Sequence, residues 1–336
     1  MSMDGSIVFV VGLIVLTVGA EMVVRGASRL AALLGVKPLV LGLTVVSIGT
    51  SVPELAVGIT ASLQGSGSLA VGNIVGTNMV NILFILGLSA LLQPLPLHLQ
   101  VLKLDLPMMV IAAAMMAGLA LDGALTPLDG GLMLVAAFLY TIALLRISRL
   151  ESRAVVKEFE DMCGIDTEEI CGTDAITRRQ REKQARLKYT VMLIAGMVIT
   201  VIGADLMVSG AIGVARTLNF SDALIGLTIV AIGTSSPELA TTVVATIRKE
   251  RDVAVGNLLG SSIYNILVIL GIICMVSPGG LPVTRELILF DIPLMMGVAL
   301  ACIPVFLSGK RISRVEGGMG VVIYLIYLLW LIHYRA

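Results

Sequence analysis

Long apolar stretches, separated by short polar segments, follow one another along almost the whole chain. The hydrocarbon layer of a membrane is about 30 Å thick, so a helix needs roughly 20 apolar residues to cross it. Ten stretches are long enough, and we predict membrane-spanning helices near residues 6–25, 39–63, 69–92, 105–121, 128–146, 189–210, 222–247, 253–276, 287–307 and 316–333. No basic leader precedes the first of them, which favours a retained helix over a signal peptide.

The polar pattern inside these stretches repeats after 184 residues. Residues 42–63 read GLTVVSIGTSVPELAVGITASL and residues 226–247 read GLTIVAIGTSSPELATTVVATI, with 13 of 22 positions identical. The following stretches, LAVGNIVGTNMVNILFILGL at 69–88 and VAVGNLLGSSIYNILVILGI at 253–272, share 11 of 20 positions. Half of the shared residues are polar, Gly or Pro and not generic apolar residues, so the chain consists of two related halves.

Each half contains five predicted helices, and this odd number forces the second half into the membrane in the opposite orientation. Inverted repeats of this kind are typical of secondary transporters, whose binding site lies near the membrane midplane between the repeats. The expected fold is therefore an all-α polytopic membrane protein with ten transmembrane helices. We expect the first repeat over residues 1–146, a charged loop over 147–188 and the inverted second repeat over 189–336.

Composition agrees with a membrane protein and narrows its partners. The 336 residues are 57% hydrophobic and 14% charged, with a mean hydropathy of +1.01, which is too apolar for a soluble domain. The formal net charge is zero, so nothing indicates a nucleic-acid partner. The chain shows no nucleotide-binding loop, so an ion gradient must supply the energy for transport. Neither a prosthetic group nor an obligatory protein partner is indicated beside the lipid bilayer.

The basic residues predict the orientation. If the N-terminus lies outside, all of the 23 Lys and Arg residues except Arg216, Arg285 and Arg335 fall in cytoplasmic segments. We therefore expect a multi-pass protein of the plasma or inner membrane. Both termini lie outside in this prediction, and the loop over residues 147–188 is cytoplasmic.

Each repeat carries a Gly-Thr-Ser-x-Pro-Glu segment inside a predicted helix. Pro53 lacks a backbone N–H and clashes with the preceding turn, so the helix should break there. The break frees carbonyl oxygens around Ser47 to Thr50, which are stable in a membrane only if they are buried in protein or line a hydrated cavity. Together with the hydroxyls of Thr50 and Ser51, they are hard oxygen ligands suited to sodium and calcium. The same argument applies to residues 233–238.

Glu54 and Glu238 are the acidic residues of these two segments. A carboxylate at membrane depth costs on the order of 2.5–3.5 kcal/mol. Equivalent positions in inverted repeats should meet near the midplane, where like charges need a cation or protons between them. The pair balances one calcium ion or two sodium ions, and a third sodium ion leaves one positive charge.

The next helix of each repeat supplies further polar groups, namely Asn73, Thr77 and Asn81, then Asn257, Ser261 and Asn265. Thr77 and Asn81 are four residues apart and can face the same side of a helix. We expect Asn81 and Asn265 to be ligands, whereas Asn73 and Asn257 form hydrogen bonds between helices.

Four other acidic residues also correspond between the repeats. Glu21 precedes Arg25 by four residues, which predicts an ion pair near a helix end. We interpret Glu21 and its counterpart Asp205 as structural residues or parts of an ion path. Asp105 and Asp291 each precede an apolar residue and a Pro, and we interpret both as helix N-caps.

The two GTS-x-PEL segments, each followed by GN-x-x-G-[ST]-x-x-x-N-I-L, resemble the alpha repeats of the calcium/cation antiporter superfamily, and most nearly its prokaryotic sodium/calcium exchangers. The resemblance covers the whole chain and implies that Glu54 and Glu238 are the principal ligands. It further implies backbone oxygens from Thr50, Thr234, Ser47 and Ala231, side-chain oxygens from Ser51, Ser235, Thr77 and Ser261 in sodium sites, and Asn81 and Asn265 in the central site.

One position departs from some of these relatives. They carry Asp where this chain has Asn265, and in potassium-dependent exchangers that Asp is tied to potassium transport. Both repeats have Asn here, which weakens the potassium-dependent interpretation and leaves two central carboxylates.

We therefore expect a secondary antiporter, not an enzyme, that exchanges calcium for sodium by alternating access. A proton-coupled calcium/cation antiporter is the alternative, because Glu54 and Glu238 could carry protons as readily as sodium. A single central site disfavours a channel. An intramembrane enzyme is disfavoured because no His-Glu-x-x-His or similar motif is present.

Overall fold

The computed structural model describes residues 5–163, 175–217, 231–277 and 279–335, without side-chain detail over 149–163, 175–182, 216–217, 231–232 and 334–335. Within these ranges, nine helices are long and apolar enough to cross a membrane: Gly5–Leu34, Pro38–Leu63, Gly67–Leu92, Val101–Asp122, Pro127–Ser148, Lys183–Ala215, Arg251–Val276, Leu287–Leu307 and Arg314–His333. They coincide with nine of the ten predicted spans. The remaining one, 222–247, is described only from Ala231 onward, and residues 222–230 lie outside the described ranges.

Two inner helices form the centre of the molecule. One consists of α5 (Gly67–Met79), η2 (Val80–Ile85) and α6 (Leu86–Leu92), and the other of α13 (Arg251–Tyr264), η6 (Asn265–Leu270) and α14 (Gly271–Val276). Each is 78% buried over its most apolar window, against 11% for α16 (Arg314–Arg335), which lies at the periphery. These two inner helices, which carry Asn81 and Asn265, therefore form the core. Outer helices such as α16 present apolar side chains to lipid.

Two pairs of very short strands join the repeats. β1 (Leu95–Pro96) pairs antiparallel with β4 (Arg311–Ile312), and β2 (Ala124–Leu125) pairs antiparallel with β3 (Leu281–Pro282). One span separates β1 from β2 along the chain, so the pairs lie at opposite ends of the helices. In each pair a loop of one repeat binds a loop of the other, which is the arrangement expected for inverted repeats.

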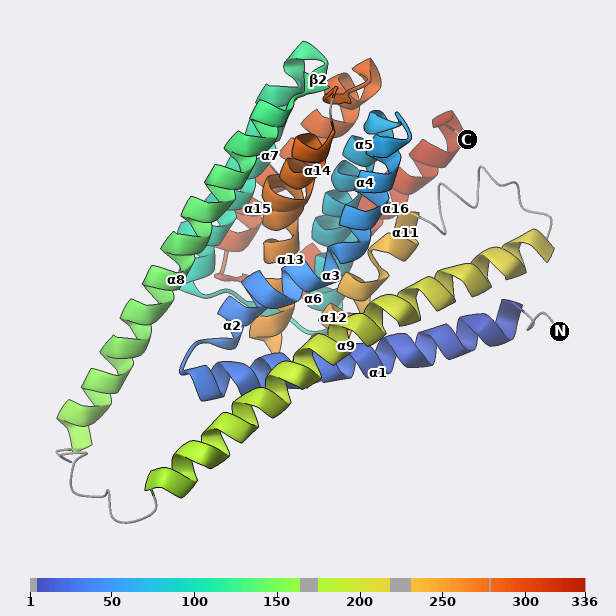
Figure 1. Cartoon of the computed structure of the whole chain (residues 1–336). Helices are drawn as coiled ribbons and strands as arrows, with labels where there is room; N and C mark the ends of the chain where they lie inside the picture. Colours follow the sequence, from blue (N-terminus) through green and yellow to red (C-terminus); the bar gives the residue numbers. More distant parts are fainter. Residues whose placement is uncertain (1–4, 164–174, 218–230, 278, 336) are drawn as a thin grey trace.

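The first helix of each repeat packs against the other along its length. α1 (Gly5–Leu34) and α9 (Ala175–Thr217) lie side by side and cross obliquely in front of the remaining helices (Figure 1). Glycines recur at every seventh position along this contact, which we call the glycine seam: Gly5, Gly12, Gly19 and Gly26 on α1, and Gly196, Gly203 and Gly210 on α9. A Cβ added at Gly203 would lie 2.2 Å from the backbone nitrogen of Leu16. Only glycine permits this close approach of two backbones.

The helices beside the central segment are longer than their predicted spans. α8 (Pro127–Cys163) continues beyond residue 146, and α9 begins at Ala175, before residue 189. Much of the predicted loop over 147–188 is therefore helical, while residues 164–174 of it lie outside the described ranges.

The interpretation of Asp105 and Asp291 as N-caps was wrong. Asp105 ends a π-helical segment, η3 (Val101–Asp105), that continues directly into α7 (Leu106–Leu119), and its φ of −74° and ψ of −44° are helical. Asp291 has the same place between η7 (Leu287–Asp291) and α15 (Ile292–Leu307). Each carboxylate instead accepts a hydrogen bond from the fifth helix of its own repeat, Asp105 from the hydroxyl of Tyr140 at 2.9 Å and Asp291 from that of Tyr327 at 3.3 Å.

The fifth helix of each repeat, α8 and α16, begins with a capping residue that we had not predicted. At the start of α8, the backbone N–H of Thr126 donates to Asp129 Oδ2 at 2.7 Å, and the N–H of Asp129 donates back to Thr126 Oγ1 at 3.3 Å. Ser313 and Glu316 make the same reciprocal pair at the start of α16, at 2.8 and 3.3 Å. Both are capping boxes, so the inverted repeats also share their helix signals.

Candidate ion-binding site

The predicted breaks are present in both repeats and have the same geometry. α3 (Ser47–Thr50) and α4 (Val52–Leu63) meet at Ser51, whose φ is −85° and ψ is 7°. α11 (Ala231–Thr234) and α12 (Ser236–Ile247) meet at Ser235, with φ −86° and ψ 7°. Two serines at equivalent positions therefore turn the chain in the same way.

The break leaves the carbonyl of Gly49 without its normal helical donor. The N–H four positions after Gly49 would come from Pro53, which has none. The carbonyl of Ser47 differs from the expectation, because it accepts the N–H of Ser51 at 3.2 Å.

Glu54 and Glu238 lie in the first turns of α4 and α12, directly after the two breaks. Both are fully buried, and Glu238 reaches across the boundary between the repeats to Ser51, three residues before Glu54, with 3.3 Å between Oε1 and the Ser51 hydroxyl oxygen. The N-terminal end of a helix stabilises a negative charge, so each helix favours the anionic form of its own carboxylate. Neither carboxylate oxygen of Glu54 has a hydrogen-bond partner within the described part of the chain, and the same holds for Glu238 Oε2.

Hydrogen bonds cross from the first repeat to the second beside these carboxylates. Ser51 Oγ donates to Glu238 Oε1 at 3.3 Å. Thr50 Oγ1 donates to Asn257 Oδ1 at 3.3 Å, and Asn257 Nδ2 donates to Thr242 Oγ1 on α12 at 3.1 Å. Asn257 thus forms the hydrogen bonds between helices that we predicted. The amide nitrogen of Asn73 makes none with any described residue.

Asn81 and Asn265 lie in π-helical turns of the two inner helices, Asn81 in η2 and Asn265 at the start of η6. Single π-helical turns are frequent at functional sites. Each turn packs against the helix that follows the break in the other repeat, because η2 contacts α12 and η6 contacts α4. The structure therefore brings each asparagine-bearing turn to the helix that carries the glutamate of the opposite repeat.

Most of the remaining predicted site residues are buried in the same region. Thr77 and Ser261 are 3% and 0% exposed, and Ser51 and Ser235 are 0% and 1% exposed. Both amide atoms of Asn81 and Asn265, and the hydroxyls of Ser235 and Ser261, have no hydrogen-bond partner among the described residues. Thr234 is half-buried, and of Ala231 the structure describes the backbone alone. Buried polar atoms normally have partners, so this concentration of unpaired oxygens indicates a place for a ligand.

Two contacts beside the site had not been predicted. The hydroxyls of Tyr264 and Thr141 lie 2.8 Å apart and join the inner helix to α8 directly before Asn265. The ring of Tyr264 also lies 5.9 Å from that of Tyr140. The hydroxyl of a buried tyrosine usually has a hydrogen-bond partner. A tyrosine inside a predicted inner helix is therefore the one feature of the sequence that could have indicated these contacts.

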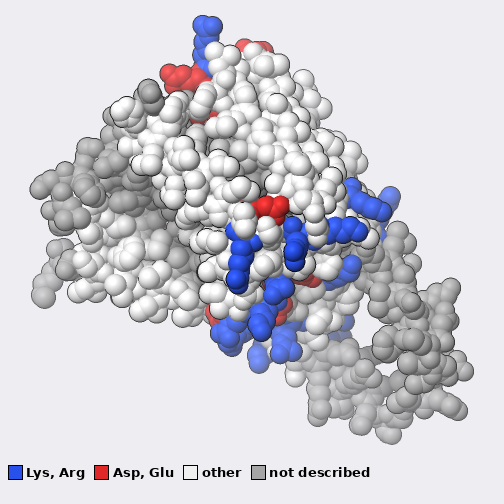
Figure 2. Space-filling view, turned by 180° about the vertical axis from the view of Figure 1, so that it is seen from behind, with Lys and Arg blue, Asp and Glu red and all other residues white. Residues whose placement is uncertain are grey.

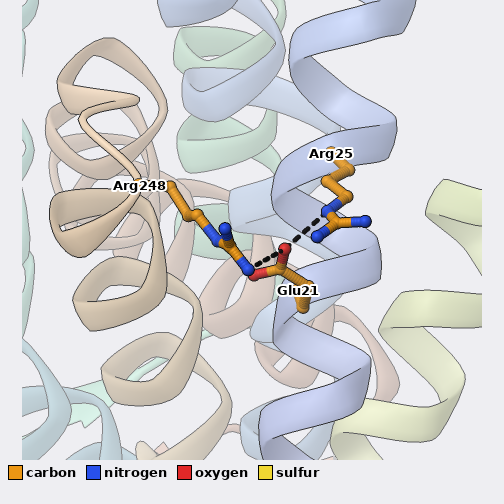
Figure 3. A network of polar contacts seen from close by, with 3 residues as sticks. All are labelled: Glu21, Arg25 and Arg248. Carbon is orange, nitrogen blue, oxygen red and sulfur yellow. Dashed lines mark hydrogen bonds and ion pairs between the residues drawn. The ribbon is translucent and has the colours of Figure 1, made fainter.

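The predicted ion pair between Glu21 and Arg25 is present, and Figure 3 shows that a second arginine joins it. This is Arg248, which follows the last residue of α12. One of its terminal guanidinium nitrogens lies 2.7 Å from Glu21 Oε1. Its Nε also donates to Glu21 Oε2 at 2.9 Å. Asp205, the counterpart of Glu21, is exposed on α9.

The site thus combines two buried carboxylates with carbonyl, hydroxyl and amide oxygens from both repeats. Hard cations such as sodium and calcium bind oxygen ligands of these kinds. Their position inside membrane-spanning helices, at helix breaks related by inverted repeats, defines a secondary transporter of cations.

Comparison with known proteins agrees with this class. The model of the family described as sodium/calcium exchanger protein matches residues 5–146 and 188–333, which is most of the chain. The chain therefore belongs to the sodium/calcium exchanger family and is a multi-pass membrane antiporter of cations.

Three of the proteins it resembles are similar over nearly their full length. The chain is 33% identical to the inner membrane protein YrbG of Escherichia coli, over 96% of this chain and 94% of that protein. It is 32% identical to the sodium/calcium exchanger MaX1 of Methanosarcina acetivorans, over 97% and 98%. The structure of the sodium-calcium exchanger NCX_Mj, soaked with sodium and without calcium, superposes with a TM-score of 0.80 at 26% identity, covering 99% of both chains.

Proposed function

We propose that this protein exchanges calcium for sodium by alternating access, with Glu54 and Glu238 as the principal ligands of both ions. The observation that carries the proposal is the fully buried Glu54, neither of whose oxygens has a partner among the described residues, beside the equally buried Glu238. An unpaired buried carboxylate is strongly unfavourable, and two that repel each other are more so. A divalent cation, or sodium ions, between them removes both costs.

The other proposed ligands surround this pair. Thr50 contributes its backbone carbonyl at the break, and Thr234 contributes the corresponding carbonyl in the second repeat, joined by backbone oxygens of Ser47 and Ala231. Ser51, Ser235, Thr77 and Ser261 contribute hydroxyl oxygens to sodium sites. The side-chain oxygens of Asn81 and Asn265 complete the central site, because the π-helical turns bring them to the opposite repeat.

The two negative charges of the site determine how much net charge one exchange cycle moves. Two carboxylates neutralise one calcium ion, so sodium ions that replace it at a ratio of three to one leave one net positive charge. Moving that charge across the membrane is worth roughly 2.3 kcal/mol per 100 mV. Sodium entry down its gradient would then extrude calcium, and the exchange current would depend on voltage.

We also propose that both termini lie outside the cell and the segment over 147–188 lies in the cytoplasm. Figure 2 shows most of the Lys and Arg side chains of one face gathered toward the lower end, below a broad band that is almost free of charge. Positive residues prefer the cytoplasmic side of a membrane protein.

The test is uptake of calcium-45 into proteoliposomes loaded with sodium, comparing wild type with Glu54→Gln and Glu238→Gln. A matched control is Glu286→Gln, which removes an exposed carboxylate outside the site. We expect sodium-dependent uptake that either site substitution abolishes and the control retains. Equal uptake under a pH gradient without sodium would instead establish proton coupling, and uptake retained in both site variants would contradict the proposed site.

A further inference from the structure

A second polar site lies away from the glutamate pair, where α1, α9 and α12 meet. It is a cavity of about 340 Å³ lined by Thr17, Val18, Glu21, Met22, Arg25, Met192 and Arg248. Its basic end is formed by Arg25 and Arg248, whose guanidinium groups both point at the single carboxylate of Glu21 (Figure 3). The cavity thus carries two positive charges against one negative charge.

The two arginines have donors to spare. A guanidinium group has five N–H donors in a fixed fork. Among the described contacts Arg25 gives Glu21 its Nε, and Arg248 gives it Nε and one terminal nitrogen. Their side chains remain 60% and 52% exposed. One net positive charge and several outward N–H groups at a cavity mouth suit an anion with several oxygens, and a phosphate group has that shape.

Apart from Thr17, whose hydroxyl donates to the carbonyl of Leu13 at 2.7 Å, the remainder of the cavity is apolar and continues onto a lipid-facing surface. Met22 and Val18 lie one turn and two turns before Arg25 on the cavity side of α1, and Met192 faces them from α9. Val18 and, one further turn away, Ile14 are 51% and 58% exposed. The same helix face therefore runs from apolar residues to a basic end, over a length that matches a phosphate group followed by an acyl chain.

We propose that this cavity binds an anionic phospholipid, with its phosphate on Arg25 and Arg248 and the start of an acyl chain along Val18, Met22 and Met192. Basic pockets between membrane helices bind anionic headgroups in this manner. Glu21 competes with the phosphate for both guanidinium groups and holds them in place when no lipid is bound. The lipid would bridge α1 to the end of α12, the helix that carries Glu238.

The measurement is the melting temperature of the full-length purified protein in detergent during titration with short-chain lipids. Phosphatidylglycerol supplies the anionic headgroup, phosphatidylcholine the zwitterionic one, and inorganic phosphate the anion without an acyl chain. A ligand that binds the folded state alone raises the melting temperature according to its affinity. We expect the apparent affinity for phosphatidylglycerol to exceed that for phosphatidylcholine by about tenfold, and no shift with inorganic phosphate.

Four variants separate this site from general surface charge. Arg25→Gln and Arg248→Gln should each lose most of the preference for phosphatidylglycerol. Lys103→Gln makes the same charge change at an exposed position on another helix and should retain it. Glu21→Gln removes the competing carboxylate and should strengthen binding of phosphatidylglycerol several-fold, whereas a purely structural role of the ion pair leaves the lipid preference unchanged.

Three outcomes would overturn the proposal. They are equal shifts by both lipids in wild type, an equal loss of preference in Lys103→Gln, and a response to inorganic phosphate that reproduces that to phosphatidylglycerol. The last outcome would assign the cavity to a free anion. None of these readouts involves calcium or sodium transport, so a failure here leaves the proposed exchange untouched, and the reverse is also true.

Discussion

Ser51 in the first repeat donates a hydrogen bond to Glu238 in the second, over 3.3 Å between Oγ and Oε1. The equivalent hydroxyl of Ser235 has no partner among the described residues, and neither oxygen of Glu54 accepts one. Two repeats with nearly identical motifs are therefore unequal at the site. The structure fixes the orientation of Glu238 through the opposite repeat and leaves Glu54 without a corresponding contact.

This inequality predicts different effects for two matched substitutions. Ser51→Ala removes a donor from a buried carboxylate, an interaction worth about 1.5–3 kcal/mol, and should raise the sodium concentration for half-maximal exchange about tenfold. Ser235→Ala removes a hydroxyl with no described partner and should have a smaller effect. Sodium titration of calcium-45 uptake measures both. Equal shifts in the two variants would show that the hydrogen bond to Glu238 is not what distinguishes them.

Tyr264 should act on Asn265 by holding its π-helical turn. Tyr264→Phe and Thr141→Val each remove the 2.8 Å hydrogen bond between their hydroxyls. We expect either variant to weaken apparent calcium affinity several-fold with little change in maximal rate, because the turn is held less firmly while the ligands remain. The double variant should be no worse than the single ones. Additive losses would mean that the two hydroxyls act separately.

The glycine seam should tolerate no side chain. A Cβ at Gly203 meets the backbone nitrogen of Leu16 at 2.2 Å, so Gly203→Ala forces α1 and α9 apart and should cost about 1–3 kcal/mol. Thermal unfolding of the purified protein measures this. Gly118→Ala and Gly297→Ala are controls in other helices, because a Cβ there meets nothing within 4 Å. They should be neutral or raise the melting temperature, since alanine favours a helix.

Lys310 offers a stabilising substitution. It has a φ of 52°, a left-handed conformation that a side chain disfavours, whereas Gly123 at the corresponding turn of the first repeat has a φ of 91°. Lys310→Gly should raise the melting temperature by a few degrees. The reverse substitution, Gly123→Lys, places a side chain in the same disfavoured region and should lower it. A fall in stability for Lys310→Gly would show that contacts of the lysine outweigh its backbone strain.

The membrane spans were predictable because length and apolarity alone decide whether a helix crosses a bilayer. The breaks at Ser51 and Ser235 were also predictable, because the lack of an N–H on proline disrupts a helix whatever its tertiary contacts are. The prediction that Asp105 is an N-cap failed because an acidic residue followed by Leu-Pro resembles the start of a helix. A π-helical segment accommodates that Pro inside a continuous helix instead.

Other features were local and were overlooked. The capping boxes Thr126–Asp129 and Ser313–Glu316 follow the known pattern of a hydroxyl residue and an acidic residue three positions apart. The contact of Glu21 with Arg248 could not be found in this way. It depends on how α1 packs against α12, and no spacing along the chain encodes that.

The two strand pairs have a consequence for how the chain is assembled in the cell. β1 and β2 are synthesised early, yet their partners at 311–312 and 281–282 belong to the last part of the chain. The first five helices therefore stay in the bilayer with both connecting loops unpaired until almost the whole polypeptide has been inserted. A ribosome that stalls after the first repeat would therefore leave a five-helix product in which both loops lack their partner strands.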